Sequence, residues 1–341
     1  MRITGEENTK RHIKQGIFEP VYLITGDDDY ITQFYRDQLE NGVCADKSGF
    51  NYHPFGKELE VDAFIESCES MPMFSDRILV SMRDFNPAKL NADVLDEILK
   101  YLPNTPKSTT VVFCFPSDYD LRNKKTASLI KTVEECGVHI SIPARTSYQL
   151  ASTIMQGAKK RETSISREDA MYLVGLVGDD MSTLLRELEK LCAFADTSPI
   201  TREMIDTVCV KSVQASVFDL FDAIMSRDAD KSYAILGSLI KQNTEPTLIL
   251  GTLAGEYADL YRMKLAKIYS GSKDEISKTY EYKNRAFRLD SAAVYAKRFS
   301  LEEIKSWLDA LNDTDMKIKF SSVNNTLALE RLLAVLLGTQ S

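Results

Sequence analysis

Residues 21–30 read VYLITGDDDY, and this stretch decides the class of fold. Residues 21–25 are apolar or β-branched and predict a buried strand; Gly26 marks a turn, and an amphipathic helix follows. In an α/β nucleotide-binding domain, this strand-turn-helix position carries a glycine-rich loop and a lysine that hold phosphates. Here residues 27–29 are all aspartate. The sequence therefore predicts an α/β domain whose phosphate site is inverted in charge.

Three carboxylates at a helix start complement the helix dipole and repel ATP. The only Gly-Lys dipeptide, Gly56-Lys57, has Asn51 where a P-loop would place its first glycine, and it continues with Glu58 rather than Ser or Thr. It fails as a phosphate-binding motif. We interpret residues 27–29 as the start of a helix and not as ligand-binding residues.

The composition is that of a globular protein with more than one domain. A chain of 341 residues with 44% hydrophobic composition is long enough for two or three domains. Its 6 cysteines include no CxxC pair, so neither a zinc site nor a disulfide framework is indicated. Residues 1–9 are polar, and no apolar run approaches the roughly 18 residues of a membrane span. We expect a soluble cytosolic protein.

Strand and helix signals alternate over the first part of the chain and then give way to helices alone. Further strands are predicted at 77–82, 109–115 and 138–142, with helical patterns between them, which indicates a doubly wound parallel sheet. Beyond Pro143 the strand signal ceases. Helix start signals then define a small helical part and a longer one. We predict three units: an α/β domain (1–143), a small helical domain (144–210) and a C-terminal helical domain (211–341).

Charge is distributed unevenly along the chain. The formal net charge is -8, which argues against a simple DNA-binding protein. Residues 261–300 nevertheless carry a net charge of +6, with tyrosine and phenylalanine between the basic residues. Such a stretch could follow a nucleic-acid backbone while its rings stack on bases, or it could be a solvated helix face above core aromatics. The sequence leaves both interpretations open.

Residues for catalysis are scarce. The three histidines have no partner at metal-ligand spacing, and no nucleophile, zinc-binding or dinucleotide-binding motif is present. Asp118 and Asp120 follow a strand, where a P-loop enzyme would hold magnesium, but without a phosphate-binding lysine we interpret them as turn residues. The sequence makes no positive case for an enzyme, and we expect no cofactor or metal.

Residues 71–77, MPMFSDR, place two large apolar side chains on a turn. Pro72 ends the preceding helix, so Met73 and Phe74 lie outside any regular element. They could pack inward against the sheet, or they could project as an anchor for a groove on a partner.

With these residues in view, the chain resembles the δ subunit family of the bacterial DNA polymerase III clamp loader. The resemblance runs nearly end to end, and its motifs lie at residues 21–30, 71–80, 178–191, 218–224, 245–253 and 329–333. Each motif alone is weak. Their order and spacing, together with the three predicted units, make the combination fairly specific.

The resemblance implies an AAA+-like domain with a degenerate P-loop (1–143), a small helical lid domain (144–210) and a helical collar domain for oligomerisation (211–341). It also implies that the chain does not hydrolyse ATP. In that family the δ subunit binds the ring-shaped sliding clamp, the β subunit, and opens it for loading on primed DNA during replication. The implied partners are the clamp, the ATPase subunits τ/γ, the subunit δ′ and primed DNA, within the DNA polymerase III holoenzyme of the bacterial cytoplasm.

The family's apolar clamp-binding plug falls on Met73 and Phe74, with Met71 as support. Met73 departs from the expected leucine, but an unbranched thioether also fills a groove. Contacts with DNA or neighbouring subunits are predicted for six basic residues of the collar: Arg285, Arg288, Lys297, Arg298, Lys317 and Lys319.

Other functions stay open beside this one. One is a different non-catalytic scaffold or adaptor with a P-loop fold, and another is an enzyme that binds nucleotide unconventionally, which only the analogy of fold supports. The δ′ subunit is disfavoured, because the Ser-Arg-Cys finger and the clustered zinc cysteines expected of that relative are missing.

Overall fold

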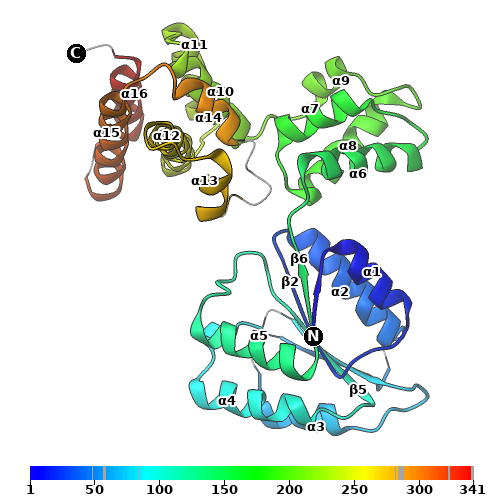
Figure 1. Ribbon diagram of the computed structural model, residues 1–341. Helices are drawn as coiled ribbons and strands as arrows, with labels where there is room; N and C mark the ends of the chain where they lie inside the picture. The colour runs from blue at the N-terminus through cyan, green and yellow to red at the C-terminus, as the bar shows by residue number, and fades with distance from the viewer. Residues whose placement is uncertain are drawn as a thin grey trace. The chain divides into compact units, whose positions relative to one another are not determined.

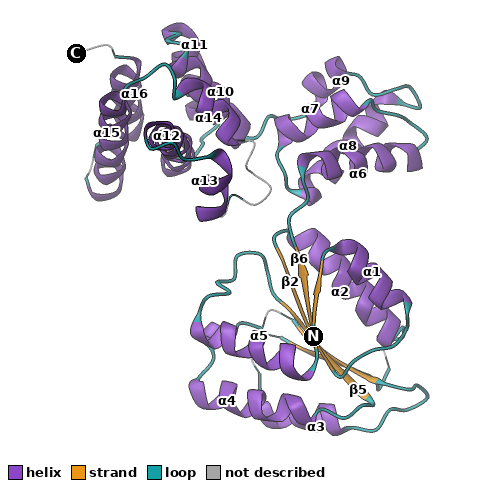
Figure 2. Cartoon of the chain, viewed as in Figure 1, coloured by secondary structure: helices purple, strands orange, loops and turns teal. Residues whose placement is uncertain are grey.

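The computed structural model describes residues 1–47, 49–56, 59–83, 85–280, 282, 288–321 and 323–338. The chain divides into two compact units, Met1–Ala144 and Arg145–Ser341. All strands of the sheet belong to the first unit, and helices build the second (Figure 1; Figure 2). Within the described residues, no helix combines the length and the hydropathy that a membrane crossing requires.

The first unit is built on one sheet of six strands, in the order β1-β6-β2-β5-β4-β3. Every neighbouring pair is parallel. The strands are β1 (Arg2–Thr4), β2 (Val21–Gly26), β3 (Tyr52–Phe55), β4 (Ile78–Met82), β5 (Thr109–Cys114) and β6 (Val138–Ile142). The doubly wound parallel sheet expected from the sequence is therefore confirmed.

Helices cover both faces of this sheet (Figure 1). The elements between the strands are α1 (Glu6–Lys14), α2 (Asp29–Val43), α3 (Val61–Glu69), η1 (Pro87–Lys89), α4 (Ala92–Tyr101), η2 (Leu102–Asn104) and α5 (Lys124–Cys136). Val21 and Leu23 of β2 belong to the core formed with α3, α4 and α5, whereas the hydroxyl of Tyr22 meets His12 of α1 on the other face. Because β2 is covered on both sides, it reads as a continuous apolar run.

The four inner strands β2, β4, β5 and β6 coincide with the predicted ones, and the two edge strands were missed. β1 has 3 residues and only one of them is buried; β3 has 4 residues and includes Pro54. Proline is tolerated in a strand at the edge of a sheet, where one side needs no hydrogen bonds. Edge strands are short and half-polar, so they lack the signal that marks a buried strand.

The second unit consists of helices with strong caps. They are α6 (Ser147–Lys160), α7 (Arg167–Val177), α8 (Met181–Ala195), α9 (Arg202–Val208), α10 (Val213–Met225), α11 (Ala229–Lys241), α12 (Pro246–Ile268), α13 (Lys273–Thr279), α14 (Arg288–Tyr295), α15 (Leu301–Phe320) and α16 (Asn325–Leu337). Ser166 caps α7, and Ser300 with Glu303 forms a capping box at α15. α13 and α14 were not predicted.

α12 is the central helix of the part that follows residue 210. It packs against α10, α14 and α15. Tyr257 is fully buried there, and its ring meets Phe221 and Trp307 edge to face, with centroids 5.2 and 5.6 Å away. Such aromatic contacts add to the burial of apolar area. The division of the chain into α/β, lid and collar domains stays a prediction.

Candidate functional site

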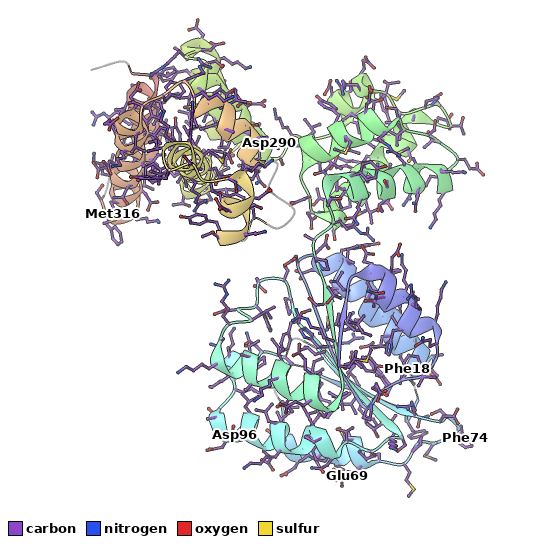
Figure 3. All side chains as sticks on the ribbon, viewed as in Figure 1. Phe18, Glu69, Phe74, Asp96, Asp290 and Met316 are labelled. Atoms are coloured by element: carbon purple, nitrogen blue, oxygen red, sulfur yellow. The ribbon has the colours of Figure 1, made fainter. Side chains whose placement is uncertain are left out.

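Residues 70–77 form a turn that connects α3 to β4 at the edge of the sheet where β4 and β5 begin. Met71 is 87% exposed, Met73 is 49% exposed and Phe74 is fully exposed. Figure 3 shows Phe74 pointing away from the body of the first unit. Of the two arrangements that the sequence left open, the structure has the projecting one.

The turn is tied to the sheet at both ends although its tip projects. The hydroxyl of Thr109 donates to the carbonyl of Cys68 near the end of α3, at 2.7 Å. After the tip, Nη1 of Arg77 donates to the hydroxyl of Thr110 at 3.0 Å. Phe74 itself has φ +61°, a left-handed conformation that costs a non-glycine residue roughly 1–2 kcal/mol. The exposed ring is thus presented by a constrained backbone.

Asn51 holds the middle of the turn, and sequence reasoning missed it. Its Oδ1 accepts from the backbone N–H of Met73 at 2.7 Å, and its Nδ2 donates to the carbonyl of Met73 at 2.5 Å. Asn51 is 9% exposed. Nothing in the local sequence marks this contact, because the two residues are 22 positions apart and belong to different connections.

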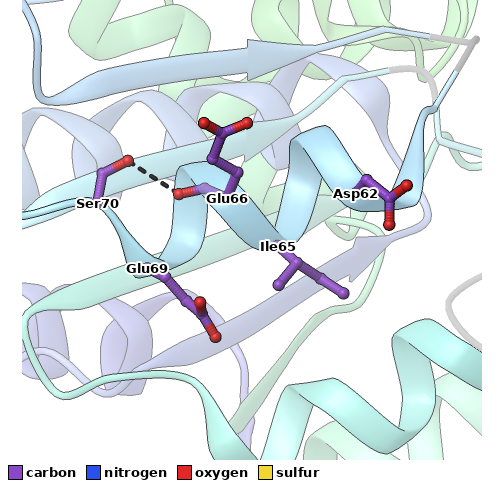
Figure 4. Close-up of a pocket in the computed structure, with 5 residues that line it drawn as sticks. All are labelled: Asp62, Ile65, Glu66, Glu69 and Ser70. Carbon is purple, nitrogen blue, oxygen red and sulfur yellow. Dashed lines mark hydrogen bonds between the residues drawn. The ribbon is translucent and has the colours of Figure 1, made fainter.

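An acidic depression flanks the turn on α3. It is lined by Asp62, Ile65, Glu66, Glu69 and Ser70 (Figure 4). Ser70 directly follows the last residue of α3, and its hydroxyl donates to the carbonyl of Glu66 at 2.9 Å. Three of the five residues that line the depression are carboxylates. It adds negative charge beside the apolar tip.

The turn in which the sequence predicts a degenerate phosphate loop contains three carboxylates that bond to the chain's own backbone. Asp28 accepts from the N–H of Ile31 and caps α2, Asp27 accepts from Ala144 N–H at 3.0 Å, and Asp29 accepts from Ser117 N–H at 2.7 Å. A Cβ on Gly26 would lie 2.2 Å from the hydroxyl oxygen of Thr32, so this turn also requires glycine. The three aspartates thus accept hydrogen bonds from backbone N–H groups at the end of the sheet where β2, β5 and β6 finish.

The described residues contain no group of three or more His, Cys, Asp or Glu side chains that could hold a metal ion. His139 is buried between the hydroxyl of Thr25 and the carboxylate of Glu134, at 2.9 and 2.7 Å, and burial lowers its pKa. Asp120 accepts from the N–H of Arg122 at 2.9 Å, the contact expected of a turn residue. These residues have structural partners.

Arg288, at the start of α14, pairs with two carboxylates of α12. Its Nη2 lies 2.5 Å from Glu256 Oε1 and 3.2 Å from Asp259 Oδ2, and its side chain is mostly buried. Burial raises the pKa of Glu256 to about 7, and the charge of Arg288 opposes that rise. These contacts argue against a DNA-binding role for Arg288. Arg285 lies outside the described residues.

The other four basic candidates are exposed but form two separate pairs. Lys297 and Arg298 precede α15, whereas Lys317 and Lys319 occupy its last turn. At 1.5 Å per residue the two pairs are about 25 Å apart along the helix. Lys319 also pairs with Asp315 at 2.7 Å. The structure therefore does not bring the six predicted residues together as one patch.

The chemistry of the tip of the turn at residues 70–77 suits docking. Met71, Met73 and Phe74 offer apolar surface without a hydrogen-bonding group that could act on a substrate. Large apolar side chains that remain exposed on a monomer are typical of binding anchors.

Comparisons with known proteins agree with the resemblance seen in the sequence. Residues 22–141 match the family model described as DNA polymerase III, delta subunit, and residues 214–336 match that for the C-terminal domain of the DNA polymerase III delta subunit. DNA polymerase III subunit delta of Bacillus subtilis (strain 168) is 25% identical over 338 residues, which cover 96% of this chain and 95% of that protein.

The subunit delta of Escherichia coli (strain K12) is 19% identical over 326 residues, covering 92% of this chain and 90% of that protein. Among solved structures, the DNA clamp loader delta protein of Bacillus subtilis matches with a TM-score of 0.62 and 24% identity, over 97% of this chain and 99% of that one. This likeness supports an AAA+-like fold. The chain belongs to the DNA polymerase III delta subunit family.

Proposed function

We propose that this protein is the clamp-loader subunit that binds the sliding clamp and opens its ring for loading on primed DNA. The observation that carries the proposal is the turn at residues 70–77, where Phe74 is fully exposed on a constrained backbone. Met73 and Phe74 enter a groove on the clamp, and Met71 supports them. We infer the class of partner from the family, and we infer from the exposed turn which residues bind that partner.

The energy available from the turn is large enough for this role. Burying a methionine and a phenylalanine contributes about 3–6 kcal/mol at roughly 1.5–3 kcal/mol per side chain, before the costs of association. The contribution is concentrated in two adjacent residues, as in other interfaces dominated by a few side chains. The acidic depression on α3 lies beside them and adds a charged rim.

In this proposal other subunits of the assembly, and not this chain, bind and hydrolyse ATP. The phosphate position of this chain is occupied by Asp27, Asp28 and Asp29, each bonded to a backbone N–H. ATP binding and hydrolysis therefore fall to the ATPase subunits τ/γ, with δ′ as a further neighbour. We place this assembly in the bacterial cytoplasm, and we assign no cofactor to this chain.

The test is the affinity of the full chain for the β clamp, measured by calorimetry. The double variant Met73→Ala, Phe74→Ala should weaken binding at least about 30-fold, since 1.4 kcal/mol corresponds to a factor of ten. The matched control is Phe194→Ala, which removes another exposed phenylalanine, from α8. It should leave the affinity unchanged.

Both variants are expected to keep the thermal stability of the parent, because the altered side chains contact little of the fold. An unchanged clamp affinity in the double variant would refute the assignment of the plug. Equal losses in the double variant and the control would point to a non-specific effect instead.

Lys297, Arg298, Lys317 and Lys319 are proposed to face primed DNA or neighbouring subunits of the loader. They are exposed side chains of the collar region with a positive charge.

A further inference from the structure

The amide of Asn51 pairs with the backbone of Met73 as a neighbouring strand would. Its Oδ1 receives the Met73 N–H at 2.7 Å, while its Nδ2 reaches the Met73 carbonyl at 2.5 Å. The backbone N–H and C=O of one residue are thus both satisfied by one buried side chain. Such a two-point contact fixes the orientation of the Met73 backbone as well as its position.

The backbone of Asn51 is itself fixed to the sheet. Its carbonyl accepts from the N–H of Leu79 at 2.8 Å, and the next residue, Tyr52, pairs with Leu79 in the β3–β4 ladder. The side chain therefore connects the edge of a regular sheet directly to the tip of the turn. Hydrogen bonds thus link β4 to Asn51 and Asn51 to the backbone of Met73.

Met73 immediately precedes the residue whose conformation is strained. Phe74 has φ +61°, and a strained backbone persists where the surrounding structure determines it. The ties at Cys68 and Arg77 hold only the two ends of the turn. Asn51 bonds to the residue directly before Phe74, and the hydroxyl of Ser75, directly after it, donates to the carbonyl of Arg77 at 2.9 Å.

We propose that Asn51 is a positioning residue that presents Met73 and Phe74 to the partner in their binding conformation. This inference rests on the proposed docking function of the turn. A preorganised turn loses less conformational entropy on binding than a mobile one, so it binds more tightly with the same contacts. In this proposal Asn51 acts through Met73, whose backbone receives both of its side-chain hydrogen bonds.

The first measurement needs no clamp. Hydrogen exchange of the Met73 amide, followed by NMR on the full chain, should accelerate about tenfold in Asn51→Ala, because the acceptor of that N–H is removed. The amide of Leu79 reports on the β3–β4 ladder and should keep its protection. The control is Asn123→Ala, which removes a side chain that caps α5 in the same unit and should leave the Met73 amide unaffected.

The second measurement is clamp affinity in a double-mutant cycle. Asn51→Ala should weaken binding about tenfold in the parent chain, the loss expected from two hydrogen bonds of ordinary net strength. In the background of Met73→Ala, Phe74→Ala it should have no further effect. The cycle isolates the action of Asn51 through the turn from any general effect on the fold.

Asn51→Asp provides a second variant of nearly the same shape. It keeps the acceptor for the Met73 N–H and replaces the donor to the Met73 carbonyl by an oxygen. We expect the Met73 amide to stay protected and the clamp affinity to fall at least threefold. This variant decides the question if Asn51→Ala does not fold.

The outcomes separate the inference from the proposed function. Unchanged Met73 exchange in Asn51→Ala, or unchanged clamp affinity in both Asn51 variants beside a weakened Met73→Ala, Phe74→Ala, overturns the positioning role. If the plug variant itself binds the clamp normally, the proposed function fails, and with it the binding part of this inference, whatever the exchange data show.

Discussion

Asp29 and Ser117 join two connections of the sheet: the carboxylate of Asp29 accepts from the backbone N–H of Ser117 at 2.7 Å. The first residue lies at the start of α2, and the second follows β5. Asp27 makes the matching contact to Ala144, which follows β6. Asp27 and Asp29 therefore hold together the carboxyl ends of three adjacent strands, β6, β2 and β5.

Removal of one of these contacts should lower stability modestly. Asp29→Ala loses an exposed hydrogen bond to a charged acceptor, and we expect the free energy of unfolding in urea to fall by about 1 kcal/mol. Asp118→Ala removes an exposed carboxylate in the same region and should change it by less than about 0.5 kcal/mol. Equal effects of the two variants would contradict the role assigned to Asp29.

The isolated chain should not bind ATP. Calorimetric titration with magnesium and ATP at millimolar concentrations is expected to give no binding heat, because the carboxylates of residues 27–29 would repel phosphates and residues 26–30 include no lysine. Neutral variants of Asp27 and Asp29 should not restore binding, since residues 26–30 supply neither a glycine-rich loop nor a lysine. A micromolar dissociation constant would revive the interpretation as an unconventional nucleotide-binding enzyme.

Loss of Arg288 should destabilise the collar strongly. Arg288→Ala leaves Glu256 and Asp259 buried without that cation, and breaking such a pair typically costs about 3–5 kcal/mol. Urea unfolding of the full chain, followed by the fluorescence of Trp307, measures the effect close to α12. Lys297→Ala removes an exposed cation nearby and serves as the control, with an expected change below about 0.5 kcal/mol.

The stability of the same region should depend on pH through Glu256. Burial raises the folded-state pKa of Glu256 from its ordinary value of 4.5 to about 7, so the folded chain holds a proton that the unfolded chain releases. This contribution to stability is fully present below pH 4.5 and is lost as the pH rises to about 7. Glu256→Gln should flatten that part of the pH profile in denaturant unfolding; a profile that is unchanged would contradict the assignment.

Any DNA affinity of the collar should come from two independent pairs of cations. Lys297 and Arg298 are about 25 Å from Lys317 and Lys319 along α15, so alanine variants of the two pairs should have additive effects on the logarithm of the affinity. Each lost phosphate contact should reduce the salt slope by about 1 in fluorescence anisotropy titrations. Lys131→Ala, in the first unit, should leave the slope unchanged. An affinity that does not vary with salt would argue against direct DNA contact.

The sequence predicted what repeats regularly and missed what depends on contacts between distant residues. β2, β4, β5 and β6 are buried on both faces and are visible as apolar runs, whereas β3 contains a proline and lies at an edge. The turn at residues 70–77 was identified because Pro72 ends α3. Its exposure could not be predicted, since it depends on how α3 and β4 pack.

The basic stretch at residues 261–300 illustrates the same limit. The sequence shows the net charge of this stretch but not which of its charged side chains face the solvent. Arg288 turns inward to Glu256, while Lys297 remains exposed. Asn51 is the opposite case, a residue without a notable local pattern that becomes informative only when Met73 is placed beside it. Contacts between residues so far apart in the sequence become visible only once the fold is known.

The turn at residues 70–77 lies where the strands of the parallel sheet begin, and Asp27 and Asp29 lie where they end. β2 spans 6 residues between these two ends of the sheet, about 20 Å at 3.3 Å per residue. Closely packed interiors transmit strain because they have little free volume to absorb it. We therefore expect a force applied at Asp27 or Asp29 to move the sheet and the turn at residues 70–77 together as one rigid body.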